Sequence, residues 1–203
     1  MHLSHPIIFE GIYTDRIKIR PVKVSDFKIM HDALRDTIKL LQPWMPWAQS
    51  LASLEDTESY LRHGEILWSH APQPGVEMPL QILDKTDKVY IGATGIKPVN
   101  FDVPSFEIGY WINRAFMGQG YITEAMNALS RFIFTEFNAK RIEINCEEHN
   151  VKSYSVAKRL NYHFEGALKN SRMTGDGKHV TSSLIYACYD INDLPPLKCQ
   201  WRL

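Results

Sequence analysis

The sequence has no excess of charge of either sign. Among its 203 residues, 23 are basic and 23 are acidic, so the formal net charge is zero with histidine taken as neutral. Non-specific nucleic-acid binding and docking to anionic membranes both depend on clustered positive charge. No block of consecutive Lys and Arg residues is present. We therefore expect no direct nucleic-acid binding and no membrane partner.

Paired cysteines and long apolar runs are also absent. Cys146, Cys188 and Cys199 are an odd number, lie far apart and form no Cys-x-x-Cys motif, and the eight histidines show no His-x-x-x-His spacing. A disulfide framework or a metal site is therefore not expected. No apolar run reaches the roughly 18 residues of a membrane-spanning helix, and residues 1–9 lack the pattern of a secretion signal. These absences predict a soluble, cytoplasmic protein.

Internal repeats and a linker between two halves are missing as well. The section richest in helix breakers, His70 to Pro79, is short enough to be a loop inside one domain. We expect a single domain over residues 7–191, followed by a C-terminal tail over residues 192–203.

Hydrophobic periodicity predicts a mixed α/β (α+β) fold rather than a regular doubly wound sheet. A strand near Ile17 to Pro21 precedes two helices, the first capped by Ser25-Asp26 and the second by Ser53 or Asp56. The remaining expected elements are strands over 80–83, 89–96 and 106–112, a helix from 122, a strand over 141–146, a helix over 150–160, and strands over 162–168 and 180–189.

A glycine-containing segment joins the strand that ends at Ile112 to the following helix. Gly118 and Gly120 allow a tight turn in which successive backbone amides point into one concavity, and the helix start adds its dipole and free donors. This predicts a phosphate or pyrophosphate site, although a Gly-x-Gly alone is equally compatible with a plain turn. No Gly-Lys-Ser/Thr follows, and no third glycine completes a dinucleotide fingerprint.

Glu107 is a candidate general base on the preceding strand. Alternation places it with Gly109 and Trp111 on one face, so its carboxylate has open space beside it and partly apolar surroundings. Such surroundings raise the pKa of a carboxylate toward the range useful for a base. The alternative is an ordinary solvated glutamate on a strand.

A second helix start, at Asn150 to Ser153, follows the strand over 141–146. Asn150 is a good helix cap, and Ser153 lies in the first turn, which is the structural interpretation. The functional interpretation makes this helix start polar and ligand-facing, close to the glycine loop, because ligands bind at the carboxyl ends of adjacent parallel strands.

These features, in this order, resemble the GNAT superfamily of N-acetyltransferases, within it the branch of bacterial enzymes that acetylate the N-termini (alanine or serine) of ribosomal proteins. The resemblance rests on four segments: Leu41 to Trp47, Phe106 to Ile112, Met117 to Ala125, and Asn150 to Gly166. It implies a mostly antiparallel, twisted sheet with helices on both faces and a central splayed strand pair. It also implies acetyl-CoA as the cofactor.

The resemblance assigns roles position by position. Met117 to Ile122 match the family's pyrophosphate loop, the Trp111 amide falls where it would stabilise the thioester oxyanion, and Glu107 falls where several members keep the general base. Ser153 matches a serine proposed in this branch to protonate the departing thiolate. The implied cofactor-binding residues are Tyr110, Trp111, Ile112, Asn113, Met117, Gly118, Gln119, Gly120, Tyr121, Ile122, Thr123, Asn150 and Ser153.

Three departures from the family pattern stand out. Met117 and Ile122 replace the usual ends of the loop, which costs a side-chain contact but no backbone amide. Ala157 occupies the position of a common tyrosine acid, so that role is empty or passes to Ser153. Arg172 replaces a glutamate that relatives carry near the end of the penultimate strand, which favours Glu107 as the base and weakens the transfer of the ribosomal-protein substrate.

The predicted reaction is direct attack of a neutral primary amine on the thioester, in an acceptor site with Trp44 and Trp47 as candidate walls; both tryptophans are equally well explained as core anchors. Three functions stay open. They are acetylation of a protein N-terminus, acetylation of a small amine (a polyamine, an amino acid or an antibiotic), and silent binding of acyl-CoA. An acidic acceptor cleft would favour the small amine, and a homodimer is left open.

Overall fold

The computed structural model describes residues 9–70 and 75–203. Residue 7, the expected start of the domain, and part of the expected breaker loop, 71–74, lie outside the described residues. No helix among the described residues is long and apolar enough to cross a membrane.

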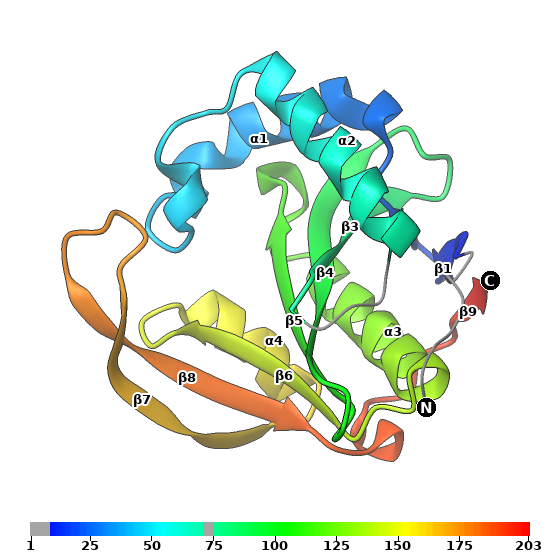
Figure 1. Ribbon diagram of the computed structural model, residues 1–203, viewed down its shortest axis with the longest axis vertical. Coiled ribbons are helices and arrows are strands. Elements are labelled where there is room, and N and C mark those ends of the chain that lie inside the picture. Colours follow the sequence, from blue (N-terminus) through cyan, green and yellow to red (C-terminus); the bar gives the residue numbers. More distant parts are fainter. Residues whose placement is uncertain (1–8, 71–74) are drawn as a thin grey trace.

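The described chain forms one nine-stranded sheet with helices on both faces (Figure 1), which confirms the predicted fold class. The strand order is β7-β8-β6-β5-β4-β3-β2-β1-β9. The strands are β1 (Gly11–Tyr13), β2 (Ile17–Pro21), β3 (Met78–Asp84), β4 (Tyr90–Asn100), β5 (Ser105–Ile112), β6 (Arg141–Glu147), β7 (His163–Met173), β8 (Val180–Cys188) and β9 (Gln200–Arg202). The α-helices are α1 (Phe27–Leu41), α2 (Leu54–His70), α3 (Tyr121–Glu136) and α4 (Val151–Arg159).

Strand alternation distributes the apolar side chains of the sheet between two cores. Phe106 and Ile108 of β5 are buried in the core that includes α3 and α4, whereas Trp111 packs with residues of α1 and α2 in the other core. Gly92 is needed where β4 and β5 approach closely, because a Cβ there would lie 2.3 Å from the Trp111 carbonyl oxygen. The two faces of β5 are therefore those predicted from the sequence.

The central strands β5 and β6 pair over only part of their length. They run parallel, and their paired residues are Ser105 to Glu107 with Arg141 to Glu143. Beyond this point β5 keeps its antiparallel partner β4 through Ile112, while β6 pairs with β8. The splayed strand pair opens a gap in the sheet at the carboxyl ends of two strands, the position where ligands bind in open α/β sheets.

The chain beyond residue 191, expected as a tail, returns to the sheet. Its β9 pairs with β1, and the Trp201 side chain donates a hydrogen bond to Glu136 Oε1 over 2.7 Å. The indole also packs edge-on against Phe132, so burial of an aromatic ring adds to strand pairing. Residues 200–202 thus extend the sheet by one edge strand.

The caps of α1 and α2 differ from one another. Ser53 and Asp56 hold the start of α2 in a reciprocal pair, since the Asp56 amide donates to Ser53 Oγ over 3.0 Å and the Ser53 amide to Asp56 Oδ2 over 3.2 Å. Asp26 stands at the start of α1 but makes no side-chain capping bond. The expected cap is wrong because buried Arg20 engages the Asp26 carboxylate instead.

Candidate functional site

The glycine loop between β5 and α3 presents unpaired backbone donors. Gly118 and Gly120 have φ values of +75° and +80°, which only glycine adopts without strain. Within the described chain, the amides of Gly118, Gln119 and Gly120 donate no hydrogen bond to a backbone or side-chain group. The sixteen-residue α3 begins immediately after them, at Tyr121. The loop therefore fits an anionic diphosphate.

Arg16, in the connection between β1 and β2, holds this loop from the side. Its Nη1 donates to the Gln119 carbonyl oxygen over 3.0 Å, its Nη2 lies 2.5 Å from Glu124 Oε2, and its guanidinium stacks on the Tyr121 ring. Arg16 also neutralises Glu124, a carboxylate in the first turn of α3 that would otherwise repel a phosphate. The sequence analysis missed this residue because Arg16 and Gln119 are 103 positions apart.

A cavity of about 150 Å³ lies where β5 and β6 diverge. A larger surface depression of about 530 Å³ lies near Phe9 and Trp68, but its lining contains no residue of the splayed strands. The cavity at the splay is lined by Trp44, Met45, Ile108, Gly109, Tyr110, Ile144, Asn145, Cys146, Glu147, Asn150, Ser153 and Arg172. It thus joins three of the four segments that carry the family resemblance to residues of β6 and β7.

The lining of this cavity includes the Asn150 amide and the Ser153 hydroxyl at the start of α4, and the Tyr110 hydroxyl of β5. Asn150 caps the helix, because its Oδ1 accepts from the Ser153 amide over 3.1 Å. The Tyr110 hydroxyl donates to the Ser153 carbonyl oxygen over 2.9 Å and lies 3.2 Å from Ser153 Oγ. Burial raises the pKa of Tyr110, so its phenol stays protonated and able to donate. Ala157 is fully buried in the core and offers no polar group.

Cys146 lies in the wall of the cavity as a neutral thiol. It is 4% exposed, and burial raises its pKa even though the Ser153 hydrogen bond and the Arg172 charge act in the opposite direction. A thiol attacks as its thiolate, so this environment is unsuited to a nucleophile at neutral pH. The geometry favours direct transfer over a covalent route through Cys146.

Glu107 is half-buried on β5, two residues before Gly109 of the cavity wall, and does not itself line the cavity. It pairs across the sheet with Lys97 and Glu143. The Glu77 carboxylate lies over Gly95, the β4 partner of Gly109. Burial raises the pKa of Glu77, Lys97 lowers it, and the Glu107 charge raises it further. Glu77 and Glu107 are thus two carboxylates on the face of the sheet that carries Gly109.

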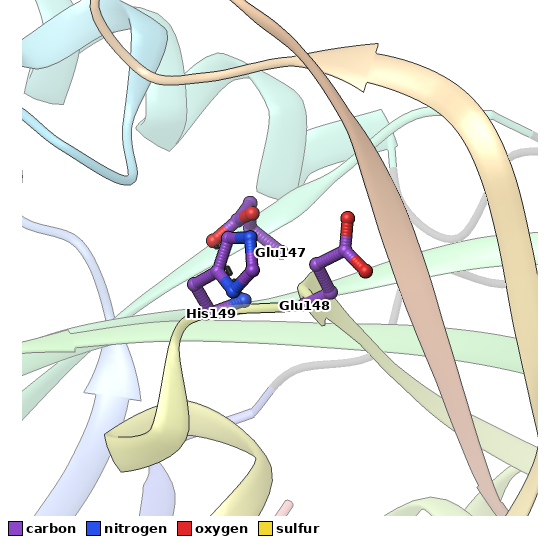
Figure 2. Close-up of side chains that lie close together, drawn as sticks. All are labelled: Glu147, Glu148 and His149. Atoms are coloured by element: carbon purple, nitrogen blue, oxygen red, sulfur yellow. Dashed lines mark hydrogen bonds between the residues drawn. The ribbon is translucent and has the colours of Figure 1, made fainter.

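Glu147, at the end of β6, is a carboxylate inside the cavity that the sequence analysis did not select. It is 3% exposed; one oxygen accepts from the Thr181 hydroxyl and the other from the His149 amide over 3.0 Å. Figure 2 shows it beside Glu148 and His149, whose ligand-type atoms lie with its own within 4.8 Å. Glu148 turns to β8, where it accepts from the Ser182 amide. These bonds hold the β6–α4 turn against β8.

Trp44 lines the cavity, whereas Trp47 does not. Trp47 is 54% exposed, because it follows Pro46 in a short 3-10 turn that buries its neighbour Ala48 instead. The connection that carries Trp44 is docked on the β7–β8 hairpin (Figure 1): the Gly175 amide donates to the Pro43 carbonyl over 2.9 Å, and Gln49 Nε2 donates to the Gly175 carbonyl over 2.6 Å. Both tryptophans were predicted as walls, and the geometry brings only Trp44 to the cavity.

The splayed sheet, the loop of free amides and the hydroxyl-lined cavity are chemically compatible with a phosphate-bearing donor and a small acceptor. The model of the acetyltransferase (GNAT) domain family matches residues 16–163, and the chain belongs to this family. It is an N-acetyltransferase with acetyl-CoA as the acetyl donor, as the motifs predicted.

Curated relatives and solved structures agree with this assignment. The chain is 26% identical over 164 residues to the ribosomal-protein-serine acetyltransferase of Escherichia coli, covering 80% of this chain and 88% of that one. It is 26% identical over 175 residues to the ribosomal protein uS5 alanine N-acetyltransferase of the same organism, covering 84% and 88%. RimL, a ribosomal α-N-protein acetyltransferase in complex with coenzyme A, superposes with a TM-score of 0.77 at 20% identity, over 88% of this chain and 96% of RimL.

Proposed function

We propose that this protein transfers the acetyl group of acetyl-CoA to the N-terminal amine of a protein, of the ribosomal type. The observation that carries the proposal is the cavity at the β5–β6 splay, whose lining includes Ser153, Tyr110 and Trp44. Curated relatives with this activity match about four-fifths of the chain. A ribosomal acceptor implies that the protein acts in the cytoplasm.

The size of the cavity favours the end of a chain over a bulky molecule. Its volume of about 150 Å³ equals roughly five water molecules and is below the roughly 300 Å³ at which drug-sized pockets begin. An N-terminal residue with its amine fits such a space while the rest of the acceptor stays outside. An antibiotic-sized acceptor is larger than this cavity and would extend beyond its rim.

The donor end would be held mainly by backbone. The free amides of Gly118, Gln119 and Gly120 and the start of α3 would bind the diphosphate, and the Asn150 side chain keeps its Nδ2 for the pantetheine arm because Oδ1 caps α4. When bound, acetyl-CoA supplies an activated acyl group as a thioester. The unpaired edge of β5 beyond Glu107 leaves backbone groups free to bind that arm and to stabilise negative charge on the thioester oxygen.

At the acceptor end, the chain must take a proton from the amine and give one to the sulfur. Glu107 would accept the proton through water, since it lies two residues outside the cavity wall on the face shared with Gly109. Gly109 has no side chain, and the space where a Cβ would stand is open for 4 Å, so nothing obstructs that approach. Ser153 Oγ, held beside the Tyr110 hydroxyl, would donate its proton to the leaving sulfur.

A small amine is the second candidate acceptor, and the Glu77–Glu107 pair is the observation that favours it. Two carboxylates beside the acceptor end would attract a cationic amine. The cavity wall itself, however, carries one acidic and one basic residue, Glu147 and Arg172, so it is formally neutral. A polyamine, which needs an excess of acidic groups, is therefore the weaker choice.

Thiol release from acetyl-CoA tests the proposal against its alternatives. The acceptors are peptides that carry ribosomal-protein N-termini, the same peptides with a blocked N-terminus, and a panel of polyamines, amino acids and aminoglycosides. We expect release with free N-termini only, with the product confirmed by mass spectrometry. Release with small amines alone would establish the second candidate, and tight acetyl-CoA binding without release on any acceptor would establish a silent binding module.

A further inference from the structure

Arg172 is a cation in the cavity wall that forms no salt bridge with a carboxylate of residues 9–70 or 75–203. It is half-buried on β7, and no hydrogen bond or salt bridge joins its guanidinium to another residue in the described part of the chain. Glu147 is the other charged lining residue. Its two carboxylate oxygens accept hydrogen bonds from the Thr181 hydroxyl and the His149 amide. A guanidinium that is partly withdrawn from water and unpaired retains five donors for a ligand.

The fold holds Arg172 in this position. A register shift in the β7–β8 ladder precedes Arg172, which then pairs with Thr181, itself hydrogen-bonded to Glu147. Beyond Arg172, the hairpin tip is fixed to the Trp44 connection through Gly175. The strand is therefore anchored on both sides of the residue, and a ligand would meet an arginine whose backbone is already ordered.

An unsatisfied acceptor lies in the same cavity. Asn145 Oδ1 is buried and has no hydrogen-bond partner, while its Nδ2 donates to Glu143 Oε2 over 3.3 Å. A buried carbonyl oxygen without a donor is rare in folded proteins. Because this oxygen is buried, the Asn145 side chain would rotate toward the cavity for an acceptor amine to supply the missing N–H. The cavity thus offers an acceptor for an amine and a guanidinium fork for an anion.

We propose that Arg172 binds an anionic group that the acceptor carries close to its reactive amine, while Asn145 accepts a hydrogen bond from that amine. The inference rests on the proposed function, and for a protein acceptor the anion is an acidic side chain within the first few residues. The same chemistry occurs in a free amino acid, whose α-carboxylate adjoins its amine. Arginine suits either, because its planar fork matches a carboxylate with two parallel hydrogen bonds.

Matched acceptors that differ only in charge test the proposal. Peptides with Asp or Asn at the second or third position form one pair, and alanine and alaninamide form another. We expect kcat/KM for the wild type to be about tenfold higher for the Asp peptide, the ratio typical of one charge-assisted hydrogen bond. Arg172→Gln should abolish the preference, and Arg172→Glu should shift it to a Lys peptide. Lys169→Gln removes an exposed charge from the same strand and should keep the wild-type preference.

The outcomes separate the two proposals. Equal rates for the Asp and Asn peptides with the wild type would overturn the role of Arg172 and leave protein N-terminal acetylation standing. A preference for alanine over alaninamide that disappears in Arg172→Gln, without release on any peptide, supports the anion site and overturns the protein acceptor. Acetyl-CoA affinity is measured for each variant, and an unchanged affinity shows that the donor end is folded. The Arg172→Lys variant keeps a single point charge and should retain part of the preference for the Asp peptide.

Discussion

The glycine loop and the cavity, which are the proposed donor and acceptor sites, present different parts of the polypeptide to a ligand. The loop uses consecutive backbone amides, positive φ values at Gly118 and Gly120, and one helix start. The cavity uses side chains from five segments, including Trp44, Ser153 and Arg172. A site made of backbone amides tolerates side-chain substitutions that leave its backbone dihedral angles unchanged. Each substitution in the cavity lining, in contrast, alters the shape or the charge of the cavity.

This difference explains the departures from the family pattern. Met117 and Ile122 stand at the two ends of the loop, where the family uses other residues, yet the free amides and the helix start are in place. Arg172, in contrast, adds a charge to the cavity. We therefore expect substitutions at the donor end to change acetyl-CoA affinity, and substitutions at the acceptor end to change turnover or the choice of acceptor.

Glu107→Gln should give the largest effect. Loss of the proposed general base is expected to lower kcat by about 100-fold with little change in acetyl-CoA affinity, because Glu107 lies on β5 and outside the glycine loop. Steady-state kinetics at saturating acetyl-CoA measure it. Glu147→Gln is the matched comparison, since Glu147 is the carboxylate inside the cavity. A large loss in Glu147→Gln with unchanged turnover in Glu107→Gln would move the base to Glu147.

Gly118→Val should act on the donor end alone. A Cβ at Gly118 meets nothing within 4 Å, so the cost is the strain of a β-branched residue at φ +75°. That strain of roughly 1–2 kcal/mol should displace the loop and weaken acetyl-CoA binding about tenfold, as measured by calorimetry. Gly177→Val carries the same strain, at φ +70° with equally open space, in the β7–β8 turn. It should leave acetyl-CoA affinity unchanged, and an equal loss in both variants would contradict the assignment of the loop.

Gly175→Ala should act on the acceptor end alone. A Cβ at Gly175 would lie 2.3 Å from the Gln42 carbonyl oxygen, so the hairpin must move away from the Trp44 connection. Overpacking of this kind costs about 1 kcal/mol or more, which corresponds to about a fivefold rise in KM for the acceptor. Acetyl-CoA affinity serves as the internal control. A rise in KM for acetyl-CoA as well would show that the two ends are mechanically coupled.

Arg16→Gln should weaken acetyl-CoA binding by a smaller factor. It releases the Gln119 carbonyl and leaves Glu124 without its cation next to the loop. Because Arg16 is 43% exposed, the expected loss is about threefold and shrinks at high salt. The double variant with Glu124→Gln should recover most of the affinity. If it does not, Arg16 acts by positioning the backbone of the loop rather than by neutralising Glu124.

The pH dependence of stability gives the smallest effect. Burial raises the pKa of Glu77 above its ordinary value of 4.5, so the folded state binds this proton more tightly than the unfolded state does. Stability from Glu77 is therefore present below about pH 4.5 and is lost as the pH rises through the raised pKa. Urea unfolding should show Glu77→Gln equal to the wild type at low pH and more stable at neutral pH. If the stability of both proteins depended on pH in the same way, the raised pKa of Glu77 would be refuted.

Short-range features of the site were predictable from the sequence. The glycine loop, the Asn150 cap and the two faces of β5 depend on residues a few positions apart, and the structure shows all three. Features that join distant segments were not. Asp26 was expected to cap α1, but it pairs with Arg20 of β2, and Trp47 was expected beside Trp44, but the turn directs it outward. Local sequence propensity does not show which of several possible partners a side chain contacts when those partners lie far away in the sequence.

The sequence by itself determined the order of the elements from β2 to β8, the family and the glycine loop, because helix periodicity, strand alternation and glycine conformation are local properties. It did not predict the short edge strands β1 and β9, which depend on pairing between the two ends of the chain. Only the tertiary structure decided the acceptor end. The splay of β5 from β6, the docking of Gly175 on Pro43 and the arrival of Arg172 beside Asn145 all depend on contacts between segments far apart in the chain. The neutral composition concealed this arrangement, since equal totals of acidic and basic residues do not reveal one unpaired cation inside a cavity.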